Sequence, residues 1–93
     1  MKTKTYASVW DAIEDTKEAA ANMRLRATLM MDIESYLAKH HLTQADGAKR
    51  FGVTQPRLND LLRGRIGKFS VDALVNMLAC AGREVAVHIK KAA

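Results

Sequence analysis

Four side chains able to make paired hydrogen bonds fall close together in this sequence. They are Gln55, Arg57, Asn59 and Arg63. An amide presents a donor beside an acceptor, and a guanidinium presents parallel donors, so each can bind two neighbouring atoms of one flat partner. Adenine offers such a pair of atoms to an amide, and guanine offers one to a guanidinium. The chemistry that these residues could perform is recognition of the edges of DNA bases.

The residues around them have the spacing of two short helices joined at a glycine. The segment runs from Gln44 to Gly64 and reads QADGAKRFGVTQPRLNDLLRG. Ala48 is small enough to let two helices cross closely, and Gly52 permits a left-handed turn after the first helix. The residues expected to face the core from the second helix are Val53, Leu58, Leu61 and Leu62. This pattern indicates a helix-turn-helix motif, whose second helix enters the major groove of DNA.

The second helix of the motif has a clear start in the sequence. Thr54 is a good N-cap, because its hydroxyl can accept a hydrogen bond from a free backbone amide. Pro56 fits the first helical turn, where a missing amide hydrogen costs nothing. We therefore predict helices at about Thr43 to Phe51 and at about Gln55 to Arg63.

A long helix is predicted before the motif. Asp15 and Glu18 have capping-box spacing, and the stretch from Lys17 to His40 contains neither glycine nor proline. Apolar residues recur there every three or four positions, as in a helix that packs on one side. They are Met23, Ala27, Met30, Ile33 and Leu37. Ahead of this helix, residues 8–14 can form a short helical turn.

A helix and a strand are predicted after the motif. Ser70 can cap the helix and Gly82 can end it. The residues expected to face inward from it are Val71, Leu74, Val75, Leu78 and either Cys80 or Ala81. Residues 84–90 then alternate as a strand does, with one apolar face formed by Val85, Val87 and Ile89. A lone strand leaves backbone groups unpaired, so we predict a homodimer in which the strands of two copies pair antiparallel.

Positive charge is concentrated around the motif. The net charge is −1 over residues 1–48 and +6 over residues 49–93. Six basic residues and a single acidic one, Asp60, lie within twenty residues of each other. The basic residues are Lys49, Arg50, Arg57, Arg63, Arg65 and Lys68. A solvated helix face normally mixes charges of both signs, so this patch indicates a surface that faces phosphates.

The spacing across residues 44–64 resembles that of the Cro/repressor-like, xenobiotic-response-element (XRE) type of helix-turn-helix protein. A narrower resemblance runs from Leu42 to Ile89 and is to small antitoxins of the HigA type, which are encoded beside a RelE/HigB-like ribonuclease toxin. The resemblance implies an all-α, lambda-repressor-like bundle of four to five helices, with the C-terminal strand pairing across a dimer. It implies a helix-turn-helix domain over residues 15–93, preceded by an N-terminal arm over residues 1–14.

The resemblance and the groove geometry together divide the site residues into two groups. Gln55 is expected to read bases, and Gln44 to contact a phosphate, because the matching glutamines of the family do so. The expected base contacts are Gln55, Pro56, Arg57, Asn59 and Asp60. The expected contacts to the DNA backbone are Thr43, Gln44, Thr54, Arg63, Arg65, Lys68 and Ser70. Pro56 departs from the glutamine or serine of many relatives, which limits it to apolar contact.

Three functional hypotheses remain open from the sequence. The first is an antitoxin that binds an inverted-repeat operator, represses its own operon and neutralises a RelE/HigB-like toxin. Val9, Trp10 and Ile13 could contact the toxin, although Trp10 could equally pack on the long helix. The second is a stand-alone phage-type or chromosomal repressor without a toxin partner. The third is an interaction module whose basic patch binds an acidic protein.

Several other classes of protein are not supported by the sequence. We expect no enzyme activity, no cofactor and no metal, because there is no glycine-rich phosphate loop or nucleophile with its base, and the adjacent His40 and His41 diverge on a helix end. We expect no membrane span and no signal peptide, since no apolar run is long enough. The single cysteine, Cys80, is expected to be an inert core thiol in a reducing cytoplasm.

Overall fold

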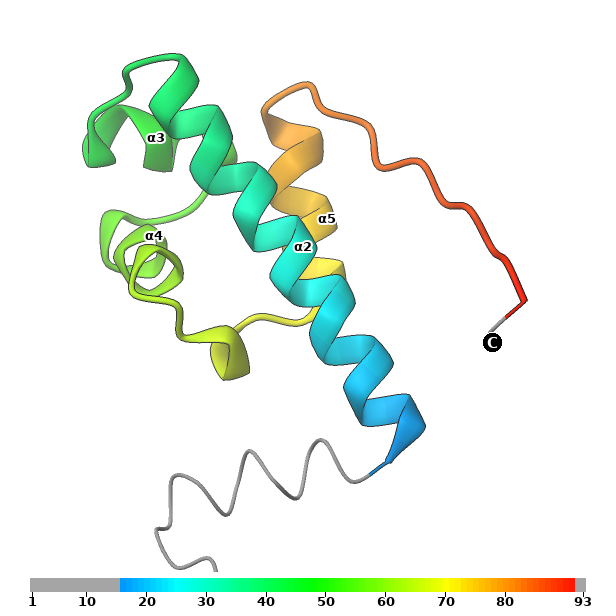
Figure 1. The fold of residues 1–93 in the computed structure, drawn as a ribbon. Helices are drawn as coiled ribbons and strands as arrows, with labels where there is room; N and C mark the ends of the chain where they lie inside the picture. Colours follow the sequence, from blue (N-terminus) through cyan, green and yellow to red (C-terminus); the bar gives the residue numbers. More distant parts are fainter. Residues whose placement is uncertain (1–15, 92–93) are drawn as a thin grey trace, which may run out of the picture.

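The computed structural model describes residues 16–91, and this part of the chain is mainly helical (Figure 1). It contains four α-helices and one 3-10 turn: α2 (Lys17–Lys39), α3 (Gln44–Phe51), α4 (Gln55–Leu62), η1 (Ile66–Lys68) and α5 (Val71–Cys80). The long helix α2 crosses the molecule, with α3 and α4 on one side of it and α5 packed beside it. The prediction of a helical bundle is confirmed.

A hydroxyl caps the start of every α-helix. The side-chain oxygens of Thr16, Thr43, Thr54 and Ser70 accept a hydrogen bond from the amide three residues later, at 3.0, 3.1, 3.3 and 3.1 Å. The caps at Thr54 and Ser70 are those expected from the sequence. The N-cap of the long helix is Thr16, one residue after the predicted Asp15, because the Thr16 hydroxyl accepts a hydrogen bond from the free amide of Ala19.

Two glycines bring the helices of the motif together. Gly52 has a φ of 71° and ends α3 in the left-handed conformation, as predicted. Gly47 was not singled out from the sequence. A Cβ there would overlap the Leu37 side chain of α2 and lie 3.1 Å from the Leu58 side chain of α4. Gly47 therefore lets α3 pack closely against both neighbouring helices.

The core is formed by apolar side chains from all four α-helices and from the segment around η1. Met30, Ile33 and Leu37 of the predicted stripe are buried, and Met23 and Ala27 are partly buried at its edge. The second helix of the motif contributes Leu58 and Leu61, both fully buried. Core residues that the sequence analysis did not name are Leu29, Tyr36, Phe51, Ile66, Phe69 and Met77.

The prediction that Cys80 is a core thiol is wrong. Cys80 is the last residue of α5 and is exposed, while Leu74, Met77 and Leu78 fill the inward positions of that helix. The helical period explains the difference: Leu74, Met77, Leu78 and Ala81 share one face, and Cys80 lies beside it. Of the two alternatives left open, Ala81 is the one that packs against the core.

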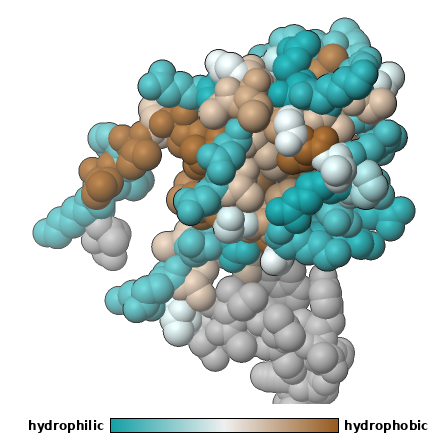
Figure 2. All heavy atoms as spheres, turned by 180° about the vertical axis from the view of Figure 1, so that it is seen from behind, coloured by the Kyte–Doolittle hydropathy of each residue, from teal (hydrophilic) through white to brown (hydrophobic). Residues whose placement is uncertain are grey.

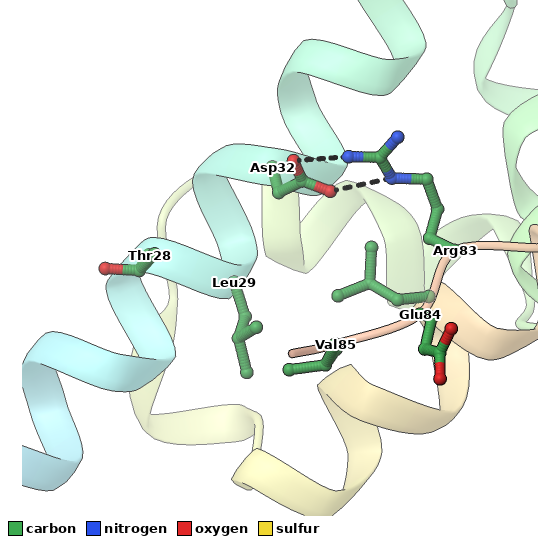
Figure 3. A pocket seen from close by; sticks show the side chains of 7 residues that line it. Thr28, Leu29, Asp32, Arg83, Glu84 and Val85 are labelled. Carbon is green, nitrogen blue, oxygen red and sulfur yellow. Dashed lines mark hydrogen bonds and ion pairs between the residues drawn. The ribbon is translucent and has the colours of Figure 1, made fainter. Parts of the chain in front are cut away.

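The segment that follows α5 lies alongside α2 and then leaves the bundle (Figure 1). Arg83 makes a two-pronged ion pair with Asp32 of α2, at 2.9 and 3.1 Å, and Val85 packs against the core below it (Figure 3). Beyond this anchor, Val87 and Ile89 are 79% and 88% exposed. Figure 2 shows apolar surface standing out at the edge of the molecule where the C-terminal segment lies.

The structure assigns no strand within residues 16–91, so the predicted strand over residues 84–90 is not found in the single chain. The physical reason is that a strand is defined by backbone hydrogen bonds to a neighbour, and this segment has none within its own bundle. The expected helical turn at residues 8–14, the arm over residues 1–14 and the residues Val9, Trp10 and Ile13 lie outside the described part of the chain. No helix within residues 16–91 is long and apolar enough to cross a membrane.

Candidate nucleic-acid interface

The side chains at the start of α4 are not covered by the other described elements. Gln55 and Pro56 are exposed there, directly after the Thr54 cap, and Asn59 is half-buried one turn later. Leu58 and Leu61 anchor the opposite face of the helix in the core. The helix is therefore held firmly from behind while its first turn faces outward, which is the placement a base-reading helix needs.

Arg57 is directed away from this exposed turn. Its guanidinium carbon lies 4.2 Å from the centre of the Phe69 ring, and Phe69 is 1% exposed. A guanidinium stacked on a fixed aromatic ring is stabilised in that position by a cation–π attraction. The side chain of Arg57 is thus held against the segment that joins α4 to α5.

Asp60 ties α4 to the same segment. Its carboxylate accepts a hydrogen bond from Arg65 at 3.0 Å and lies 3.6 Å from the ammonium group of Lys68. Both basic side chains remain about half exposed, while the Asp60 side chain is 21% exposed. Asp60 thereby positions two cations at the surface, and its own oxygens are occupied.

A polar groove opens where α2, α4, η1 and the start of α5 meet. Its polar lining residues are Asn22, Arg26, Arg57, Lys68 and Ser70. Among the residues that the structure describes, no carboxylate lines this groove, and three of its lining residues, Arg26, Arg57 and Lys68, are positively charged. Such a groove would attract an anion of the size of a phosphate group.

Arg26 lines this groove, and the sequence analysis did not name it as a site residue. Its Nη1 donates to the backbone oxygens of Ile66 and Phe69, at 3.0 and 3.3 Å, across 40 and 43 residues of chain. A signal was present in the sequence, because Arg26 falls three residues after Met23 and four before Met30, on the apolar stripe of the long helix. A charged residue at such a position must find polar partners.

The remaining predicted backbone contacts lie at the start of α3 and at the two ends of α4. Thr43 and Gln44 lie at the exposed start of α3, and Arg63 is exposed at the end of α4. Arg50 is withdrawn from the basic patch, since it donates to the Tyr36 hydroxyl and lies 5.8 Å from that ring. Thr43, Gln44 and Arg63 therefore remain exposed on α3 and α4, while Arg65 and Lys68 supply cations on the segment between α4 and α5.

Comparisons with known proteins agree with this geometry. A family described as "Helix-turn-helix domain" matches residues 12–90. The chain belongs to this helix-turn-helix family. One solved structure similar to it is assigned to the XRE family of transcriptional regulators, with 26% identity and a TM-score of 0.71 over 78% of this chain and 82% of that one. No curated protein matches the chain.

These matches support the coarser conclusions drawn from the sequence. The domain is a helix-turn-helix that shares its fold with an XRE-family transcriptional regulator, and helix-turn-helix domains of regulators bind double-stranded DNA. The family is one of regulators and not of enzymes.

Proposed function

We propose that this helix-turn-helix chain is a sequence-specific repressor that places α4 in the major groove of an operator. The observation that supports this most directly is the pair of exposed residues Gln55 and Pro56 on the first turn of α4, beside a groove lined by cations. Gln55 is suited to adenine, and Pro56 can contact a thymine methyl group. Asn59, one turn further along, is the third base-reading residue in this proposal.

For Arg57 and Asp60 we propose roles that differ from those expected from the sequence. Because Arg57 is stacked on Phe69 and lines the groove with Lys68, we assign it to the DNA backbone and not to a base. Because Asp60 is paired with Arg65 and Lys68, we assign it to positioning these two cations. Phosphate contacts of this kind fix the register of a protein on DNA, while base contacts determine the sequence. The other members of the proposed backbone group are Thr43, Gln44, Thr54, Arg63 and Ser70.

The test is a fluorescence titration with the DNA upstream of the chain's own gene, at two salt concentrations and against a scrambled duplex. If the chain is a repressor, it should bind its operator at least about a thousandfold more tightly than the scrambled duplex. Its log Kd should also change steeply with log salt. The matched variants are Gln55→Ala and Ala45→Ser, since Ala45 is an exposed position on α3 outside the proposed base-reading group. Equal binding to both duplexes by the wild-type chain would overturn the proposal and favour an acidic protein as the partner of the basic patch.

We further propose that the active form is a homodimer on an inverted repeat. The exposed Val87 and Ile89 support this, since an extended segment with an uncovered apolar face is stabilised by pairing with a second copy. In this proposal Val87 and Ile89 form the pairing surface. Val85 instead packs on its own core and fixes where the segment leaves the bundle. Two recognition helices about 34 Å apart would then meet successive major grooves on one side of the DNA.

We also propose that the repressor is the antitoxin of a toxin–antitoxin module. This rests on the resemblance of residues 42–89 to HigA-type antitoxins, and Val9, Trp10 and Ile13 are the proposed toxin contacts. The alternative is a stand-alone repressor. Co-expression with the product of the neighbouring gene separates the two. Capture of a RelE/HigB-like ribonuclease, lost on deletion of residues 1–11, supports the antitoxin, whereas a neighbouring gene of another kind refutes it.

A further inference from the structure

We infer that Arg26 is a positioning residue for DNA binding, which acts by holding the η1 segment in the shape that grips the DNA backbone. The inference rests on the proposed function, because it takes the cations of this segment to be phosphate ligands. It goes further by placing the control of these ligands on α2, a helix outside the helix-turn-helix motif.

The first step of the argument is the geometry of the two hydrogen bonds. Ile66 begins η1 and Phe69 follows its last residue, so the two carbonyl oxygens bound by Arg26 stand at the two ends of one turn. The same turn is closed by a backbone bond of 3.2 Å from the Phe69 amide to the Ile66 oxygen. A single guanidinium nitrogen on α2 thus spans the turn and fixes it against the bundle.

The second step is what this turn carries. Lys68 is part of it and Arg65 precedes it, and both are paired with Asp60. Phe69 follows it and supplies the ring on which the Arg57 guanidinium rests. Three of the proposed phosphate ligands, Arg57, Arg65 and Lys68, therefore depend for their positions on the segment that Arg26 holds.

The third step is that other contacts hold only part of the segment, namely the Asp60 ion pairs and the backbone bond of 3.1 Å from the Arg65 amide to the Asp60 oxygen. Ile66 and Phe69 are buried, but Gly67 and Lys68 between them are exposed, and the 3-10 turn has no side-chain cap at its start. Short 3-10 turns have poor hydrogen-bond geometry and little stability of their own. The two hydrogen bonds from Arg26 join the backbone of this turn to α2, and bonds from a charged donor are stronger than neutral ones.

Arg26 reaches the same groove as the cations it positions. Its side chain lines the hollow together with Arg57 and Lys68, and its Nε is buried without a hydrogen-bond partner among the described residues. Removal of the Arg26 side chain would therefore change both the position of the cations on the η1 segment and the positive potential of the groove. The exposed Arg24, two residues earlier on the same helix, does not line this groove and so provides a matched control.

The experiment compares Arg26→Gln, Arg26→Lys and Arg24→Gln in the full-length chain. We measure Kd for operator and scrambled DNA over a range of salt, together with the unfolding temperature. Arg26→Gln should weaken binding to both duplexes by about tenfold, and the slope of log K against log salt should become shallower by up to about 1.8 as two phosphate contacts are lost. Arg24→Gln, with the same loss of charge, should change binding to each by less than about twofold. Arg26→Lys, which keeps a charged donor on a side chain one atom shorter, should lie between them.

A double-mutant cycle with Lys68→Gln separates positioning from general stability. If Arg26 acts through the η1 segment, the effects of Arg26→Gln and Lys68→Gln on DNA affinity will be clearly less than additive. Should Arg26→Gln fail to fold, the same cycle is run with Arg26→Lys. Additive effects, or a change no larger than that of Arg24→Gln, would overturn the inference. If the wild-type chain bound operator and scrambled DNA equally well, the proposed function itself would be refuted.

Discussion

The assignment of Arg57 to a phosphate gives a quantitative prediction for the Arg57→Ala variant. The guanidinium rests 4.2 Å from the Phe69 ring centre and lines the groove with Lys68, so the variant should lose one phosphate contact and no base contact. The slope of log K against log salt then becomes shallower by about 0.9. Between 50 and 200 mM salt, that corresponds to a penalty about 3.5 times larger at the lower concentration.

The assay is a set of titrations with operator duplexes that carry every single base-pair change in one half-site. For Arg57→Ala, Kd should rise by a similar factor for all duplexes, so the ranking of the duplexes stays that of the wild-type chain. Gln55→Ala is the contrasting variant, for which preference should be relaxed at one base pair by roughly 1–3 kcal/mol. If Arg57→Ala instead relaxed preference at one G·C pair and left the salt slope unchanged, the stacked position of Arg57 would not be the one used on DNA.

Three further predictions concern stability and assembly. Gly52→Ala should destabilise the fold by about 1–2 kcal/mol or more in chemical denaturation, because Gly52 is left-handed and an added Cβ would lie 2.9 Å from the Cys80 sulfur. Gly64→Ala should cost less, since its surroundings are open at a similar φ of 75°; equal costs would show that the Cys80 contact is unimportant. Thr54→Ala should cost about 1 kcal/mol through loss of the α4 cap, and an unchanged midpoint would argue against that cap. Val87→Asp combined with Ile89→Asp should give a monomer by light scattering, whereas Asp at the alternate positions 86 and 88 should leave a dimer; a wild-type monomer would refute the pairing proposal.

Local features of the sequence were enough to predict the helices and the motif. The caps at Thr54 and Ser70 and the left-handed turn at Gly52 depend on residues within four positions of each other. The buried faces follow from a period of 3.6 residues, which a sequence displays directly. The α3–Gly52–α4 unit and its outward polar face were therefore predictable without knowledge of the rest of the fold.

The roles of individual side chains at the interface were decided by tertiary structure. Arg57 faces Phe69, twelve residues later, and Arg26 binds backbone oxygens 40 and 43 residues away. No periodicity specifies such partners, because they depend on how helices far apart in sequence are packed against one another. Cys80 was misplaced for a related reason: a run of small residues at the end of α5 did not show which of them would face the bundle.

The C-terminal segment shows the same division most clearly. Its alternating pattern sets which side chains share a face, and that pattern is a property of the sequence alone. A strand also needs hydrogen bonds to a neighbour, and beyond the Arg83–Asp32 ion pair Val87 and Ile89 are exposed, away from their own bundle. The sequence by itself determined the helices, their caps and the polar face of α4, because these depend on near neighbours. Only the packed structure decided which cations are held together and which apolar side chains stay uncovered, because those depend on contacts between distant parts of the chain.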